Sequence, residues 1–136
     1  MGLAAHVIAS ETFDDPGTMA AAGAAAEGVV FPSPAAFDTR RPQGAKFQQA
    51  FETKYGQPPG VTADTAYDAL MMVTQAMEHG ATKGPEIRDY LFALKGYAGV
   101  AGVTTFDRHG DAPKNVTFYE VRQGKPVALD QTPAPG

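Results

Sequence analysis

Three successive segments of this 136-residue chain carry apolar residues at helical spacing, and they constrain the fold more than any other feature. The segments span residues 46–55, 64–79 and 86–95, and within each the apolar positions recur three and four residues apart. The three stripes consist of Phe47, Ala50, Phe51 and Tyr55; of Tyr67, Leu70, Met71, Thr74 and Met77; and of Ile87, Tyr90, Leu91 and Leu94. A glycine follows each segment and is expected to end the helix. Each stripe needs a sheet or other helices to cover it.

Segments with strand character flank these three helices. The other predicted elements are strands at 6–10 and 28–32 around a helix at 18–26, and strands at 103–106, 116–121 and 126–129. Pro32 is expected to end the second strand. The pair Gln123-Gly124 predicts the turn of a terminal hairpin. The order β-α-β, three helices and a β-rich end indicates an α/β fold.

Charge and cysteine content exclude several classes of function. Eleven Lys and Arg residues against fifteen Asp and Glu give a net charge of −4, and the basic residues form no stripe of the kind that binds nucleic acid. The absence of cysteine excludes disulfides, cysteine–zinc sites and cysteine nucleophiles. The opening Met1-Gly2-Leu3 lacks the features of a signal peptide and leads almost directly into an apolar segment, so we expect a truncation.

Neither the histidines nor the acidic residues suggest a metal site. His6, His79 and His109 lie far apart, and none has a second ligand at helical spacing. The spacing from Asp107 to Asp111 superficially resembles a calcium loop, but it is too short for that loop and lacks its distal glutamate. We therefore predict a turn there and no metal.

The sequence also offers little for catalysis. Nucleophile, phosphate-binding and dinucleotide-binding motifs are absent. Glu11 with Asp14 or Asp15 could form a carboxylate pair for acid–base chemistry. Acids at this position, between a strand and a helix, more often cap the helix or face water. We expect no catalytic residue and no cofactor.

Four segments, taken in order, resemble one known family. They are AAEGVVFPSP at 25–34, FQQAFETKYG at 47–56, AYDAL at 66–70, and GVAG at 99–102 leading into Thr105-Phe106-Asp107 and Gly110-Asp111. Together they resemble the last third of the type I periplasmic substrate-binding proteins of branched-chain amino-acid ABC transporters.

The resemblance implies an α/β protein with two lobes that close on a ligand. It assigns residues 1–34 with 114–130 to a far lobe and 35–113 to the helical part of a near lobe, and it leaves 131–136 as a disordered tail. Most of both parallel sheets of that three-layer α/β/α fold would be missing. These sheets would cover the apolar stripes of the three helices in the complete fold. Without them the stripes need another surface, so we expect the chain to self-associate.

The resemblance also implies three ligand-binding positions. In leucine-binding relatives a glutamate after the far-lobe strand pairs with the ligand's ammonium group, and Glu11 occupies that place. A solvated acid flanking a helix remains the alternative for Glu11. An aromatic residue before the long helix packs on the ligand side chain in those relatives. Thr62 stands there in this chain, with Asp64 close by, which puts a purely aliphatic ligand in doubt.

The function implied is solute binding without catalysis, as the solute-binding component of an ABC uptake system for branched-chain or related amino acids. Its partners would be a small amino acid or related molecule and an inner-membrane permease, with no nucleic acid, and its location would be the periplasm. The alternative is a ligand-sensing module of the same fold from a receptor or regulator. A small enzyme built on Glu11 and its neighbours is a third hypothesis, which lacks a nucleophile, metal or cofactor motif.

Overall fold

Two compact units make up the chain in the computed structural model, which describes residues 5–34 and 39–129. We call residues 1–35 with 115–136 the terminal unit and residues 36–114 the central unit. Each is described by itself below. Whether they correspond to the far and near lobes stays a prediction, and the tail predicted at 131–136 lies outside the described residues.

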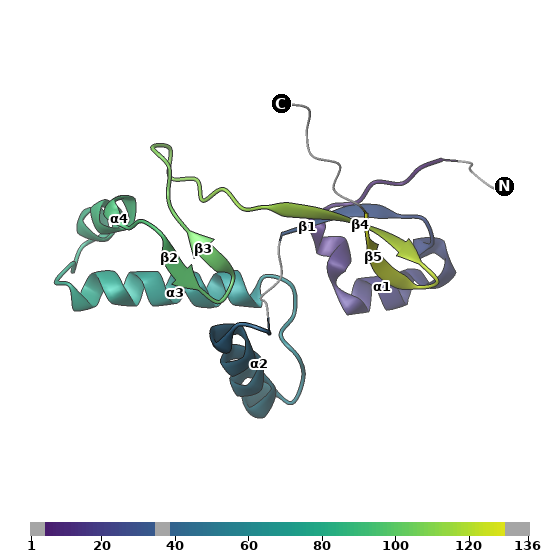
Figure 1. Ribbon diagram of the computed structural model, residues 1–136, viewed down its shortest axis with the longest axis horizontal. Helices are drawn as coiled ribbons and strands as arrows, with labels where there is room; N and C mark the ends of the chain where they lie inside the picture. Colours follow the sequence, from purple (N-terminus) through teal and green to yellow (C-terminus); the bar gives the residue numbers. More distant parts are fainter. Residues whose placement is uncertain (1–4, 35–38, 130–136) are drawn as a thin grey trace. The chain divides into compact units, whose positions relative to one another are not determined.

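The terminal unit is a small antiparallel sheet with helical turns on one face (Figure 1). Its elements are η1 (Glu11–Asp14), α1 (Pro16–Ala22), η2 (Gly23–Ala26), β1 (Val30–Pro34), β4 (Val116–Arg122) and β5 (Lys125–Ala128). The strand order is β1-β4-β5, and the β4–β5 pair confirms the predicted hairpin at Gln123-Gly124.

The core of the terminal unit lies between the sheet and the helical turns. Phe31 is fully buried and lies among Ala26, Val29 and Val121. Its ring centroid lies 5.9 Å from that of Tyr119 on the neighbouring strand. Burial of such side chains, each worth about 1.5–3 kcal/mol, holds η2 and the sheet together.

Two strand predictions in this unit were wrong in detail. Residues 6–10 form only an isolated parallel bridge, between Ile8 and Val30, because the chain turns into η1 at Glu11. The second strand does not end at Pro32 but continues to Pro34. The Val30 N–H donates a hydrogen bond to the Val7 carbonyl and so points away from β4. Backbone groups two residues apart in a strand point in the same direction, so the backbone nitrogen of Pro32 also faces away from β4. The missing N–H of Pro32 therefore costs no hydrogen bond to β4.

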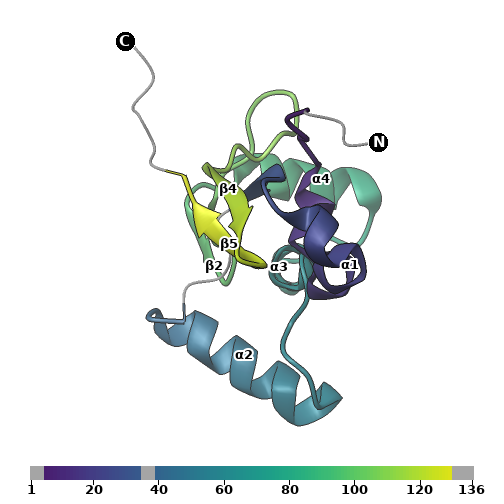
Figure 2. The ribbon, with the colours of Figure 1, turned by 90° about the vertical axis from the view of Figure 1, so that its right-hand side faces the viewer.

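The central unit contains three helices and a two-stranded hairpin. The helices are α2 (Pro42–Tyr55), α3 (Ala63–Glu78) and α4 (Gly84–Ala93), and the antiparallel strands are β2 (Tyr97–Gly99) and β3 (Gly102–Thr104). All three predicted helices are confirmed. The first begins earlier than predicted, because Pro42 occupies a first-turn position where its missing N–H is harmless. Figure 2 shows α2 lengthwise, with the segment that joins it to α3.

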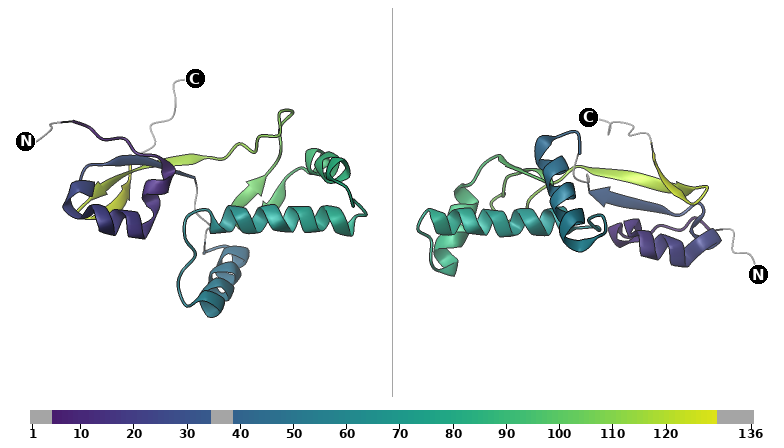
Figure 3. Two further views of the ribbon diagram at one scale, coloured as in Figure 1. Left: turned by 180° about the vertical axis from the view of Figure 1, so that it is seen from behind. Right: turned by 90° about the horizontal axis from the view of Figure 1, so that it is seen from below.

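Helix α3 has two different faces. Asp64, Asp68, Met72 and Ala76 form a buried stripe, and both views of Figure 3 show the β2–β3 hairpin along one side of the helix. The predicted apolar stripe points elsewhere: Tyr67, Leu70, Met71 and Met77 are 44%, 66%, 38% and 57% exposed. The described residues therefore leave this stripe largely uncovered.

Candidate functional site

Glu11 is the first residue of η1, directly after the bridge that joins residues 7–9 to β1. Its side chain is exposed and makes no hydrogen bond or ion pair with the residues that the structure describes. The carboxylate is therefore accessible and uncommitted within this part of the chain.

The two other acids of this loop have structural partners. Asp15 is the N-cap of α1, and its Oδ1 accepts a hydrogen bond from the Thr18 N–H at 2.9 Å. Asp14 Oδ2 accepts a hydrogen bond from the Ser33 hydroxyl at 2.7 Å, which ties η1 to β1. The capping interpretation holds for Asp15, and neither of these acids pairs with Glu11.

Thr62 lies at the N-terminal end of α3 with a backbone φ of 71°. A β-branched residue is a genuine outlier at positive φ, because its side chain crowds the backbone there. The carbonyl of Thr62 accepts hydrogen bonds from the Ala66 N–H at 3.0 Å and the Thr65 hydroxyl at 2.9 Å. These bonds start the helix and hold Thr62 in place, with its side chain exposed.

Asp64 differs from Thr62 in its surroundings. It is 7% exposed, and its Oδ1 accepts a hydrogen bond from the Thr65 N–H at 2.8 Å. A carboxylate in the first turn is favoured by the positive end of the helix dipole. The structure gives Asp64 a part in starting α3, while Thr62 is the more accessible of the two.

Thr62 and Asp64 lie together at the start of α3 in the central unit, whereas Glu11 belongs to the terminal unit. That all three contact one ligand stays a prediction.

Asp68 is the residue that the sequence interpretation missed. It is 2% exposed, and its two carboxylate oxygens accept hydrogen bonds from the Val100 and Ala101 N–H groups, both at 2.8 Å. These amides belong to the turn between β2 and β3. Gly99 is required beside them, because a Cβ at this position would overlap the Asp68 carboxylate. This bidentate contact, which we call the Asp68 clasp, fixes the hairpin to α3.

A signal for the Asp68 clasp was present in two of the family-like segments, AYDAL and GVAG. An acid one helical turn after Asp64 lies on the same face of α3, and two successive backbone N–H groups in a glycine-flanked turn suit a carboxylate. Asp68 and Val100 are 32 residues apart in the sequence, and local spacing does not reveal that they meet.

A cavity of about 400 Å³ lies between α2, α3 and β2 in the central unit. Its lining includes the aromatic residues Phe47, Tyr67 and Tyr97, and the ring centroids of Phe47 and Tyr67 lie 5.2 Å apart. Burial raises the pKa of Tyr97, and the negative charge of Asp68 adds to the effect. Both effects favour the neutral form of the Tyr97 hydroxyl.

The turn predicted at Asp107–Asp111 is confirmed. Asp107 Oδ1 accepts hydrogen bonds from the N–H groups of His109 at 2.8 Å and Asp111 at 3.0 Å, as in an Asx-turn.

Within residues 5–34 and 39–129, no group of three or more potential ligands lies close enough together to hold a metal ion. None of the helices in these ranges is long and apolar enough to span a membrane.

Comparison with known proteins gives a consistent picture. A family model described as periplasmic binding protein matches residues 1–126. A leucine-binding protein from Thermotoga maritima is 26% identical, with a TM-score of 0.76 over 95% of this chain and 37% of its own. A substrate-binding protein of an ABC transporter from Desulfitobacterium hafniense, solved with leucine, is 30% identical, with a TM-score of 0.68 over 90% of this chain and 35% of its own.

A third similar structure is a branched-chain amino-acid transporter substrate-binding protein from Streptococcus pneumoniae, solved with isoleucine. It is 26% identical, with a TM-score of 0.74 over 94% of this chain and 37% of its own. The chain thus spans little more than a third of the length of these relatives. The curated proteins compared with the chain gave no match.

Proposed function

This chain belongs to the periplasmic binding protein family, and from that premise we propose that it is a solute-binding component of an ABC uptake system for branched-chain or related amino acids. The expected α/β fold, as a part of the type I binding-protein fold, is confirmed. The proposed mechanism is capture of the solute between two lobes, with no bond made or broken.

The observation that carries this proposal is the exposed, uncommitted carboxylate of Glu11. It follows the segment that bridges to β1, the place where the family resemblance puts the partner of the ligand's ammonium group. Asp14 and Asp15 beside it are engaged with Ser33 and Thr18, so Glu11 is the acid of this loop that is left to bind a cation. An ammonium–carboxylate pair is strongest where a closing cleft excludes water.

The family supports the expected partners and location. Relatives solved with leucine and isoleucine suggest an aliphatic amino acid as solute, but Thr62 offers a hydroxyl where the family resemblance expects an aromatic ring. We therefore include polar amino acids among the candidates. The proposed location is the periplasm or the cell exterior, and the proposed partner is a membrane permease of the ABC type.

Transfer into a complete relative would test the proposed role of Glu11. The chain would replace the matching segment of the Thermotoga maritima leucine-binding protein, and calorimetry would measure binding of leucine, valine, threonine and glutamate. Glu11→Gln should weaken the binding of the preferred amino acid by about 1.5–3 kcal/mol, as for a hydrogen bond to a charged group.

Glu78→Gln provides the matched control, because Glu78 is an exposed acid at the far end of α3. It should leave the affinity unchanged. If the Glu11→Gln and Glu78→Gln chimeras bind the amino acid with equal affinity, Glu11 is a solvated acid that does not contact the ligand. That result would remove the main support for the proposal.

A further inference from the structure

The cavity between α2, α3 and β2 is not part of the predicted ligand site. Its volume of about 400 Å³ lies within the range of about 300–1,000 Å³ that is typical of small-molecule sites. None of the three predicted ligand positions, Glu11, Thr62 and Asp64, is among the described residues that line it. The cavity is therefore a second place for a small molecule, and it lies entirely within the central unit.

Three aromatic side chains from three different elements line this cavity. Phe47 of α2 is 9% exposed, and its ring plane makes an angle of 52° with that of Tyr67 on α3. Tyr97 of β2 is the third. Aromatic rings pack favourably in tilted arrangements of this kind. The lining therefore suits a ligand that carries an aromatic ring of its own.

The lining also includes a cationic side chain, that of Lys46. It lies next to Phe47 on α2, is exposed, and makes no hydrogen bond or ion pair with the residues that the structure describes. Gln43 lies one helical turn earlier on the same side of α2 and also lines the cavity, where its side-chain amide can donate a hydrogen bond. An ammonium group together with an amide donor suits a carboxylate.

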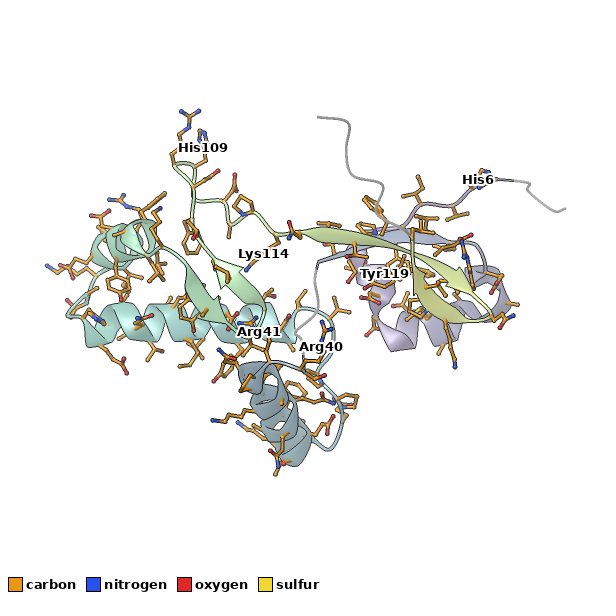
Figure 4. All side chains as sticks on the ribbon, viewed as in Figure 1. His6, Arg40, Arg41, His109, Lys114 and Tyr119 are labelled. Atoms are coloured by element: carbon orange, nitrogen blue, oxygen red, sulfur yellow. The ribbon has the colours of Figure 1, made fainter. Side chains whose placement is uncertain are left out.

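The acid in the lining does not cancel this positive charge. Both carboxylate oxygens of Asp68 are engaged in the Asp68 clasp. Arg41 donates a hydrogen bond at 3.3 Å to the carbonyl of Gly99, which lines the cavity, and Figure 4 shows Arg41 where α2 begins, beside the hairpin. Arg41 and Lys46 thus set two positive charges against one negative charge. Burial raises the pKa of Tyr97, which favours a neutral hydroxyl that does not repel an anion.

We propose that this cavity is a binding site for a small aromatic carboxylate. The ring of the ligand lies among the three aromatic side chains, and its carboxylate accepts hydrogen bonds from Lys46 and Gln43. A neutral aromatic molecule would leave the Lys46 ammonium unpaired, and an aromatic ammonium would bring like charges together. The site does not rest on the proposed solute-binding function, whose predicted residues lie outside this cavity.

Three ligands with one skeleton would test the charge preference on the full chain: phenylacetate, 2-phenylethanol and 2-phenylethylamine. Nitrogen–proton correlation NMR should show saturable shifts at the amides of residues 97–100 with phenylacetate, with a Kd on the order of 1 mM for a ligand of this size. The alcohol should bind about tenfold more weakly because it lacks the charge, and the amine should not bind. Equal binding of all three, or no saturable shift with phenylacetate, would overturn the proposal.

Lys46→Met separates the effect of charge from that of packing. It should weaken phenylacetate binding about tenfold and leave 2-phenylethanol unchanged, because only the carboxylate uses the ammonium group. Lys54→Met is the matched control, because Lys54 lies about two turns further along α2 and does not line this cavity. It should change neither ligand. An equal loss of both ligands in Lys46→Met, or equal effects of the two variants on phenylacetate, would contradict the assignment of Lys46.

A bulky side chain at Ala50 tests the location of the site independently. Ala50 is an exposed position of α2 that lines the cavity, whereas Ala45 is an exposed position of the same helix that does not. Ala50→Phe should fill the cavity and abolish the saturable shifts with phenylacetate, and Ala45→Phe should leave the Kd unchanged. Phenylacetate binding that survives Ala50→Phe with the same Kd would place the ligand elsewhere and overturn the proposal.

Discussion

Backbone strain at Thr62 is the most informative feature at the scale of single residues. A positive φ at a β-branched residue costs on the order of 1–3 kcal/mol, and it persists only where the surroundings impose it. The chain carries this strain at a position that the family resemblance assigns to ligand contact, and we propose that the strained conformation has a functional role.

Thr62→Gly should therefore raise the free energy of unfolding by about 0.5–1 kcal/mol, because glycine adopts positive φ without steric cost. Urea denaturation followed by the helical circular dichroism signal would measure the change. Thr65→Gly, inside the first turn of the same helix, should instead lower the stability. Destabilisation by both variants would show that Thr62 is not strained.

Asp68 supplies a second prediction at this scale. Asp68→Asn should lower the stability of the central unit by about 2–3 kcal/mol, because the amide nitrogen would face a backbone N–H donor and leave it unpaired in a buried site. Urea denaturation measures the loss. Asp89→Asn, at an exposed pair with Arg88, should change stability by less than about 1 kcal/mol. Similar losses for both variants would contradict the Asp68 clasp.

At the scale of elements, local hydrogen bonds at helix ends explain where the helices begin. Glu86 lies in the first turn of α4, and its carboxylate accepts hydrogen bonds from the Thr82 N–H at 2.7 Å and the Lys83 N–H at 3.0 Å. These two backbone hydrogen bonds hold the pKa of Glu86 below its ordinary value of 4.5, and the bond from Thr82 has the larger effect. The start of α4 is therefore sensitive to acid.

The sign of the pH effect follows from the depressed pKa. The contribution of Glu86 to stability is complete above the pKa of the unfolded chain, and it is lost as the pH falls through the lower pKa of the folded chain. Urea midpoints measured from neutral to acid pH should fall less steeply in Glu86→Gln than in the parent chain. Glu78→Gln should retain the parent's pH dependence, and a parent-like slope in Glu86→Gln would contradict the prediction.

At the scale of the whole molecule, each of the two units exposes large apolar side chains. In the central unit these side chains include the outer stripe of α3, and in the terminal unit they include Val116, Phe118 and Val127, which are 43%, 51% and 38% exposed. A soluble monomer rarely leaves contiguous apolar patches of more than a few hundred Å² in water. The expected self-association therefore stays a prediction, with these two surfaces as its proposed sites.

Leu70→Gln tests this prediction, because Leu70 is the most exposed residue of the stripe on α3. Size-exclusion chromatography with light scattering should find the parent chain as a dimer or larger, and Leu70→Gln should shift it toward the monomer. Val103→Gln replaces a similarly exposed residue outside the stripe and should have no effect. A monomeric parent at low micromolar concentration would contradict the prediction.

The sequence by itself determined the elements whose signals are local. Helical periodicity located α2, α3 and α4, and the turn residues Gln123-Gly124 and Asp107–Asp111 located two turns, because the side chains that stabilise these elements are close in the chain. The family resemblance likewise depended on short segments in a fixed order, and it is confirmed. The positions of Glu11, Thr62 and Asp64 in a ligand site remain predictions that rest on that resemblance.

Tertiary structure alone decided which groups meet across long separations. The Asp68 clasp joins residues 32 positions apart, and β1 passes through Pro32 because its partner β4 arrives from the far end of the chain. The same holds for α3, where Asp68 of the buried stripe binds the hairpin and the more obvious apolar stripe is exposed. Periodicity shows that a helix has an apolar face, but which face is covered depends on what the rest of the fold brings to it.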